Sequence, residues 1–205
     1  MSVDPTIKDD LFQGQVIKAA QQLFRQYGLQ KVTMDDVAKA VGKGRSSLYY
    51  YYKSKVEIFE AVMNAEIDEI LAEVARAVDR ASGAEQKIHA FGVTKLKEAR
   101  KRRSFYATLE AGMDADERSH YAKTEPAIRA RIMAEESALL GKVIMDGVAN
   151  GELRPMDQKE LDGLVFVLLS SIHGLKRKLV EDNDLRSIEP AIDTLTRMII
   201  YGLST

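Results

Sequence analysis

The chain has no cysteine and only four prolines among its 205 residues. Without cysteine it can form neither a disulfide nor a thiolate metal site, which is typical of proteins from the reducing cytosol. With so few prolines, and thirteen glycines, long helices are easy to build and many-stranded sheets are hard to turn. No apolar run reaches the roughly 18 to 20 residues that a membrane-spanning helix requires, so we expect no membrane association.

Other common signatures are missing as well. The N-terminal sequence contains acidic residues and no apolar core of a signal peptide, so we expect a cytoplasmic protein. The three histidines, at positions 89, 120 and 173, share no metal-ligand spacing. No nucleophile motif or pair of catalytic carboxylates stands out. We therefore predict no metal, no cofactor and no enzymatic activity.

Apolar residues recur at helical spacing along the chain, and no alternation typical of a strand appears between turn residues. The prediction is an all-α fold of about nine helices. The first four end or begin at recognisable signals: Gly28, a Thr33 cap with Asp36, the sequence Gly42-Lys43-Gly44, and a Ser54–Glu57 capping box. Later helices are expected at 84–103, 104–113, 124–150, 157–182 and 187–203, with the polar "DADERSH" (114–120) as a break.

Charge is distributed unevenly although the net charge is only −1. Residues 31–55 contain six basic and two acidic side chains, which indicates a local basic patch on a neutral chain. A second basic run, "KLKEARKRR" (95–103), is interpreted as the solvated C-terminal end of a helix, where the macrodipole favours cations.

Two short helices joined by a three-residue turn with glycine form a candidate helix-turn-helix, whose second helix would enter the major groove of DNA. On that helix, Leu48 and Tyr52 are expected to face inward, against Phe24, Val37 and Val41. The outward face would present Arg45, Ser46, Tyr49 and Tyr50, while the side of Tyr51 is left open. Arginine can bind guanine O6 and N7 through two hydrogen bonds, and serine and tyrosine hydroxyls can reach bases or phosphates.

Two lysines favour the same interpretation. Lys53 precedes the Ser54 cap and Lys55 lies in the first turn of the fourth helix, where a cation opposes the helix dipole. A DNA phosphate bound beside these lysines would make their positive charges favourable at this position. The alternatives are a nucleotide-binding loop, for which Gly42 and Gly44 are too close and no strand precedes them, and a purely structural helix hairpin.

Residues 17–63 resemble the DNA-binding domain of the TetR family of bacterial transcriptional regulators. The resemblance rests on Ala20, Leu23, Phe24, Tyr27 and Gly28, on "TMDDVA" (33–38), on Gly42, on "LYYYYKSK" (48–55) and on Phe59. It covers about a quarter of the chain. Lys43 and Gly44 depart from the small apolar residue and the serine or threonine cap that are usual in the family. The predicted DNA-contacting residues are Thr33, Lys43, Gly44, Arg45, Ser46, Ser47, Tyr49, Tyr50, Lys53 and Lys55.

The resemblance also implies a C-terminal domain that dimerises and binds a small effector. Two late helices with apolar residues on more than one face support a four-helix bundle across a twofold axis. The alternative is that both helices line the core of a monomer. The predicted interface consists of Leu164, Leu168, Ile172, Leu175, Ile192, Leu195 and Ile199. Effector-contacting candidates are Phe105, Tyr106, Met113, Tyr121, Met133, Phe166 and His173, each of which could equally be a core residue.

The expected domains are a helix-turn-helix domain at 1–53 and an effector-binding and dimerisation domain at 54–205. The expected function is a homodimeric repressor that binds a palindromic double-stranded operator and is released by a small, largely apolar effector. Two alternatives stay open: a helical ligand-binding or enzymatic bundle with a vestigial helix-turn-helix, and a regulator controlled by a protein partner.

Overall fold

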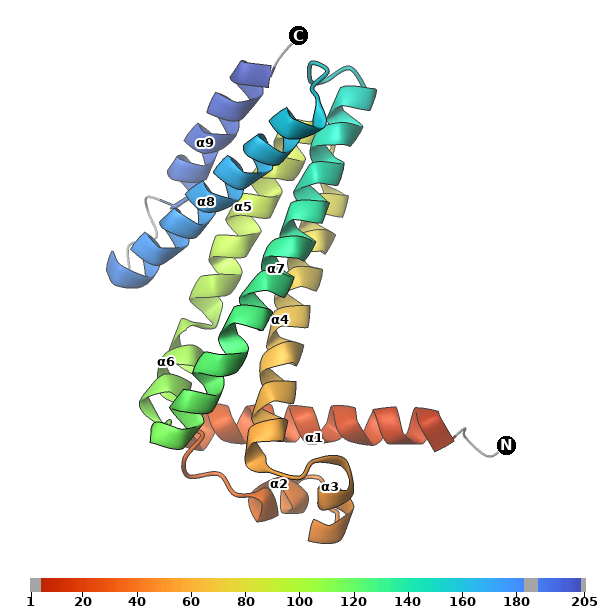
Figure 1. The fold of residues 1–205 in the computed structure, drawn as a ribbon, viewed down its shortest axis with the longest axis vertical. Helices are drawn as coiled ribbons and strands as arrows, with labels where there is room; N and C mark the ends of the chain where they lie inside the picture. Colours follow the sequence, from red (N-terminus) through yellow and green to blue (C-terminus); the bar gives the residue numbers. More distant parts are fainter. Residues whose placement is uncertain (1–4, 183–187, 204–205) are drawn as a thin grey trace. The chain divides into compact units, whose positions relative to one another are not determined.

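The computed structural model describes residues 5–182 and 188–203, and within them every regular element is an α-helix. The type and number of these described elements confirm the predicted all-α fold of about nine helices (Figure 1). The helices are α1 (Pro5–Tyr27), α2 (Met34–Ala40), α3 (Arg45–Tyr51), α4 (Lys55–Arg80), α5 (Gly83–Lys101), α6 (Arg103–Ala111), α7 (Ala115–Ala149), α8 (Gln158–Asp182) and α9 (Ile188–Leu203). No described helix is long and apolar enough to cross a membrane.

The first helix ends follow the predicted local signals. Gly28 has a φ of +79°, and its N–H donates to the carbonyl of Phe24 at 3.0 Å. At the start of α2, the Asp36 N–H donates to Thr33 Oγ1 at 3.2 Å and the Thr33 N–H donates to Asp36 Oδ2 at 2.9 Å. This capping box is confirmed.

The capping box predicted before α4 forms only in part. The Glu57 N–H donates to Ser54 Oγ at 3.2 Å, as expected for a cap. The Glu57 carboxylate, however, accepts from the Lys53 N–H at 2.7 Å. In a complete box it would accept from the N–H of the cap residue itself.

The predicted break at residues 114–120 is wrong, because α7 already begins at Ala115. Asp114 Oδ1 accepts from the Glu117 N–H at 2.8 Å, and Glu117 Oε2 accepts from the Asp114 N–H at 3.2 Å. This reciprocal cap satisfies the first helical N–H groups, so a polar segment that looked like a loop is a helix start. Pro126 lies inside the same helix.

The chain forms two compact units, each with its own apolar core. Unit 1 comprises the described residues up to Asp68 together with Ser104–Pro126, and unit 2 comprises Glu69–Arg103 and the described residues from Ala127 onward. Helices α4 and α7 each contribute to both units. The boundary between residues 53 and 54 stays a prediction, since these units reflect packing and not function.

In unit 1, α1 is joined to α4 by a buried carboxylate. Glu66 is fully buried and accepts hydrogen bonds from Gln21 and, at 2.5 Å, from Arg25. The Arg25 guanidinium lies 4.8 Å from the centre of the Phe105 ring of α6. Beside these groups, the Phe24 and Phe59 rings meet edge to face, with centroids 6.4 Å apart.

In unit 2, α5 packs against α8 and α9. Phe91, Leu96, Leu140, Ile144 and Leu168 lie at the centre of its core, each without solvent exposure. Gly147 of α7 allows a close approach here, because a Cβ built on it would lie 2.8 Å from the Ala84 Cβ and 3.0 Å from Leu153 Cδ1.

We predict that Gly147→Ala destabilises the protein, because the Ala84 methyl cannot move aside and overpacking typically costs about 1–3 kcal/mol. Gly141 lies in the same helix and is the matched control, since its added Cβ would meet nothing within 4 Å. Gly141→Ala should stabilise by about 0.5–1 kcal/mol through helix propensity. Equilibrium urea unfolding measures both, and equal stability of the two variants would contradict the packing described for Gly147.

Candidate functional site

The turn between α2 and α3 is closed by main-chain hydrogen bonds. The Gly42 N–H donates to the carbonyl of Lys39 and the Lys43 N–H to that of Ala38, both at 3.0 Å. Gly42 has a φ of +65°, a conformation that glycine adopts without strain. Gly44 is the N-cap of α3 and makes no side-chain capping bond.

The inward face of α3 is the predicted one. Leu48 is 0% exposed and Tyr52 7% exposed. Both lie in the core of unit 1 with Phe24 and Val37, and Val41 packs against the same core. These contacts determine which side of the short helix is left to solvent.

The outward side presents most of the predicted DNA-contacting residues. Tyr50 is 73% exposed. Seven others are exposed as well: Thr33, Lys43, Gly44, Arg45, Ser46, Ser47 and Lys53. Tyr49 and Lys55 are half-buried.

Arg45 is held in place on this outward side. Its Nε lies 3.3 Å from Asp35 Oδ1, and its Nη1 donates to Asp35 Oδ2 at 3.3 Å. Its Nη2 donates to the Tyr49 hydroxyl at 3.2 Å, and the guanidinium lies 5.3 Å from the centre of the Tyr49 ring. The hydrogen bond to Tyr49 and the charge of Asp35 raise the pKa of Arg45. The cation is thus oriented by its own unit before any ligand binds.

Lys53 has a structural role that the sequence analysis missed. Its ammonium group donates to the carbonyls of Tyr49 and Tyr50 at 2.9 and 3.0 Å. These carbonyls lie in the last turn of α3, where a cation is favourable. The unfavourable interaction expected between this cation and the N-terminal end of α4 is therefore offset by its favourable contacts with the C-terminal end of α3.

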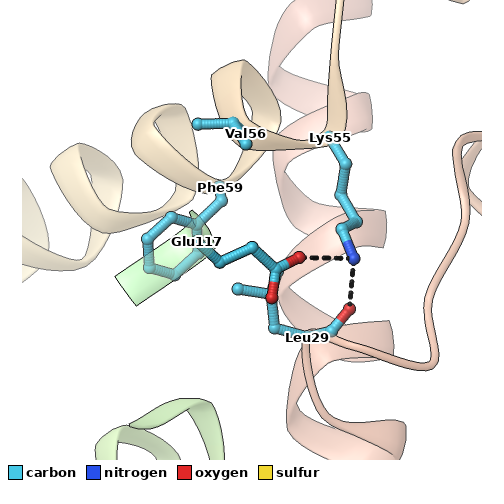
Figure 2. Close-up of a pocket in the computed structure, with 5 residues that line it drawn as sticks. All are labelled: Leu29, Lys55, Val56, Phe59 and Glu117. Carbon is cyan, nitrogen blue, oxygen red and sulfur yellow. Dashed lines mark hydrogen bonds and ion pairs between the residues drawn. The ribbon is translucent and has the colours of Figure 1, made fainter. Parts of the chain in front are cut away.

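Lys55 also has partners within the protein, as Figure 2 shows. Its ammonium group donates to the Leu29 carbonyl at 3.1 Å and lies 2.7 Å from Glu117 Oε1. The small pocket beside it, lined also by Val56 and Phe59, has a volume of about 10 Å³, which is barely the space of one water molecule. Lys55 therefore already has a carboxylate partner within the protein, which the unrecognised first turn of α7 supplies as Glu117.

Tyr51, whose side was left open, packs toward α1. Its hydroxyl donates to Asp9 Oδ1 at 2.5 Å, and its ring centre lies 5.0 Å from that of Phe12. The hydrogen bond to Asp9 is the main cause that raises the pKa of Tyr51 to about 12. The four consecutive tyrosines therefore have different roles, with Tyr50 exposed, Tyr52 in the core and Tyr51 tying α3 to α1.

Residues 16–62, which contain this helix pair, match the sequence model of a family described as "Bacterial regulatory proteins, tetR family". Over these residues the chain has the DNA-binding segment typical of the TetR family. The matched residues include the turn, all of α3 and the first two turns of α4.

Individual relatives of this chain are regulators. It is 25% identical over 159 residues to the uncharacterised HTH-type transcriptional regulator YhgD of Bacillus subtilis. The aligned region covers 75% of this chain and 78% of that protein. A TetR/AcrR-family regulator from Thermobifida fusca has 25% identity and a TM-score of 0.62, over 93% of this chain and 97% of the other. The fatty acid degradation regulator FadR from Bacillus halodurans shares the fold, with 16% identity and a TM-score of 0.60 over 93% and 98% of the two chains. The chain is accordingly a DNA-binding transcriptional regulator.

The structure does not bring the seven effector candidates together. Phe105 and Met113 are buried in the core of unit 1, and Tyr106 and Tyr121 pack against that core. In unit 2, Met133 and Phe166 line an open groove of about 500 Å³ between α7 and α8. His173 follows on α8, one turn beyond the groove-lining Leu169.

The predicted dimer interface needs correction. Leu168, Ile172, Ile192 and Ile199 are at most 9% exposed within one chain, so they have almost no surface to offer a partner. Leu164, Leu175 and Leu195 pack against the same core. The large apolar side chains that α8 and α9 do expose are Phe166, Val167, Met198 and Tyr201.

The basic run 95–103 is not a fully solvated helix end either. Lys95 is 5% exposed and pairs with Glu136 of α7, which is 2% exposed. Arg102 is 4% exposed and pairs with Glu98 and, at 3.2 Å, with Glu69. Burial lowers the pKa of Lys95, while the charge and hydrogen bond of Glu136 oppose that shift. Both cations are paired with carboxylates, as buried charges require.

We predict that Tyr51→Phe removes the last phenol ionisation, near pH 12, from an ultraviolet titration of the folded protein. A pKa raised from the ordinary value of 10 to about 12 means that the phenol stabilises the fold fully below pH 10 and loses this effect as the pH rises through 12. The gap in melting temperature between the parent and Tyr51→Phe should therefore close over that window. Tyr50→Phe, which removes an exposed phenol, should leave the last ionisation in place.

For the buried pair, Lys95→Met and Glu136→Leu should each cost about 3–5 kcal/mol of unfolding free energy, because each leaves one charge buried without its partner. The double variant should cost much less than the sum, since two apolar residues then replace the pair. Equilibrium denaturation of the four proteins measures this coupling. Additive losses would show that the two charges do not depend on each other.

Proposed function

We propose that this chain is a repressor that binds a palindromic operator as a homodimer and releases it when a small, largely apolar effector binds. The observation that best supports DNA recognition is the outward side of α3, where Arg45 is exposed yet oriented by Asp35 and Tyr49. We further expect it to act in the cytoplasm, where bacterial DNA lies.

In the proposed complex, α3 enters the major groove. Arg45 donates both guanidinium N–H groups of one edge to guanine O6 and N7, which requires it to exchange Asp35 for the base. Ser46, Ser47 and Tyr50 are placed to bind nearby base edges or phosphates, and Lys43 to bind phosphate. Thr33, Gly44, Tyr49 and Lys53 would contribute contacts at the edge of this surface. Lys55 is left out of the proposed set, because Glu117 and Leu29 already bind its ammonium group.

Dimerisation is proposed through the exposed apolar side chains of α8 and α9. Phe166 and Val167 are 66% and 55% exposed, and Met198 and Tyr201 are 68% and 80% exposed. Large apolar side chains exposed on neighbouring helices are typical of a surface that a partner covers. A twofold dimer would present its two recognition helices to half-sites one DNA turn apart, about 34–36 Å.

Release requires an effector with higher affinity for a DNA-incompetent state than for the DNA-bound one. The groove between α7 and α8 supports the proposal of such an effector, since about 500 Å³ suits a small ligand. Family resemblance suggests that α4, which contributes to both units, transmits the change. The largely apolar lining of this groove suggests an apolar ligand.

We predict that Arg45→Ala weakens binding to the preferred palindrome by about 1–3 kcal/mol per half-site and relaxes the base preference there. Lys43→Ala should weaken binding to all sequences and lower the slope of log K against log salt by about 1 per protomer. Fluorescence anisotropy with DNA selected from genomic fragments measures both. Arg76→Ala, which removes an exposed arginine of α4 paired with Glu73, is the charge-matched control. Unchanged affinity of Arg45→Ala would refute the assigned recognition surface.

A further inference from the structure

Three ionisable side chains meet inside unit 2, each from a different helix. Lys95 of α5 forms the buried pair with Glu136 of α7 and donates to His173 Nε2 of α8 at 2.8 Å. Glu136 Oε2 lies 3.5 Å from the same His173 nitrogen, beyond ordinary hydrogen-bond length. Lys95 and Glu136 are buried, whereas the His173 side chain is 36% exposed.

This contact determines where His173 carries its proton. An ammonium group has donors and no acceptor, and the charge of Glu136 beside it keeps Lys95 an ammonium. With Lys95 as the donor, His173 Nε2 accepts at 2.8 Å and the ring hydrogen lies on Nδ1. A doubly protonated ring would place two donors 2.8 Å apart. The opposite edge of the half-exposed imidazole thus offers one N–H donor, strengthened by the cation behind the ring.

The groove between α7 and α8 leads toward this donor. On α7 it extends from Met145 to Met133, a length of about 18 Å at the rise of an α-helix, and on α8 it extends from Gln158 to Leu169. His173 lies four residues beyond Leu169, and hence on the same side of α8. Most of the lining is apolar or small, including Gly141, Leu161, Val165 and Phe166.

Three of the polar side chains along the groove, Lys142, Gln158 and Asp162, have partners within the protein. Lys142 binds Asp146 at 2.7 Å, and Gln158 donates to Asp162 at 2.7 Å. Near His173 the charge is positive, because the exposed Lys176 follows one turn later on α8. Burial first, and Lys176 to a smaller extent, lower the pKa of Lys95. An anionic acceptor is therefore favoured at this end of the groove, and a cationic group is disfavoured.

We propose that the groove binds a single-chain amphiphile with a carboxylate head, whose apolar chain lies between α7 and α8 and whose carboxylate accepts from His173 Nδ1–H. Lys95 and Glu136 are positioning residues, since they set the tautomer and orientation of His173. This assignment rests on the proposed function, for which it names the chemical class of the effector.

The test compares three ligands with the same chain and different heads, below their micelle concentrations: dodecanoate, dodecanol and dodecyltrimethylammonium. Isothermal titration calorimetry on the full chain should show dodecanoate binding at least about tenfold more tightly than the other two. His173→Phe keeps a ring of similar size and removes the donor. It should weaken dodecanoate binding by about tenfold or more and leave dodecanol nearly unchanged. The control is His89→Phe, which changes a histidine paired with Asp193.

A second variant tests the groove itself. Gly141 lines the groove, and its added Cβ would meet nothing within 4 Å, so Gly141→Leu fills the groove without disturbing the core. It should abolish binding of both dodecanoate and dodecanol. Ala130→Leu places the same side chain at an exposed position of α7 outside the groove and should bind like the parent. The double variant Lys95→Met/Glu136→Leu should bind dodecanol but lose its preference for the carboxylate.

Each outcome bears on the proposal. Equal affinity for the three heads, or a His173→Phe variant that still prefers dodecanoate, overturns the assigned head site. Dodecanoate binding that survives in the Gly141→Leu variant overturns the assigned groove. The groove is also overturned if the parent protein binds no ligand and Gly141→Leu changes the protein from dimer to monomer. DNA binding is measured separately by anisotropy. Intact operator binding with no dodecanoate binding refutes the ligand class alone, whereas absent DNA binding refutes the proposed function.

Discussion

The anchoring of α3 by Leu48 and Tyr52 is the constraint on which the proposed recognition surface depends. A helix of seven residues is too short to be stable alone in water, because too few hydrogen bonds repay the cost of its first turn. Burial of Leu48 and Tyr52, the Tyr51–Asp9 hydrogen bond and the Lys53 contacts with the last carbonyls hold it in place. The opposite side is then left to solvent, with Arg45 oriented on it.

The sequence predicted this region well because its signals are local. A cap such as Thr33 with Asp36, or a glycine at positive φ such as Gly28, involves neighbours within a few residues. The alternation of Leu48 and Tyr52 with exposed residues is equally a property of one short segment. Lys55 was misinterpreted because its partner, Glu117, is 62 positions away in a helix whose first turn looked like a polar loop.

The interface residues were misassigned for a different reason. Helical periodicity shows that α8 and α9 have apolar faces, but it cannot show whether a face meets its own chain or another copy. Leu168 and Ile192 are buried inside unit 2, while Phe166 and Met198 of the same two helices remain exposed. The same limit applies to Phe105 and Met113, whose aromatic and thioether side chains fill the core of unit 1.

The buried Lys95–Glu136 pair shows why charge runs are hard to interpret from sequence. The basic run that contains Lys95 suggested solvation, yet the removal of two charges from water is expensive and is seldom repaid by their mutual attraction alone. Apolar residues of similar size would stabilise unit 2 at least as well. What such residues could not do is orient His173, because they lack the hydrogen-bond donor that Lys95 directs at His173 Nε2. The pair is therefore better explained by the polar group it presents at the end of the groove than by the stability it contributes.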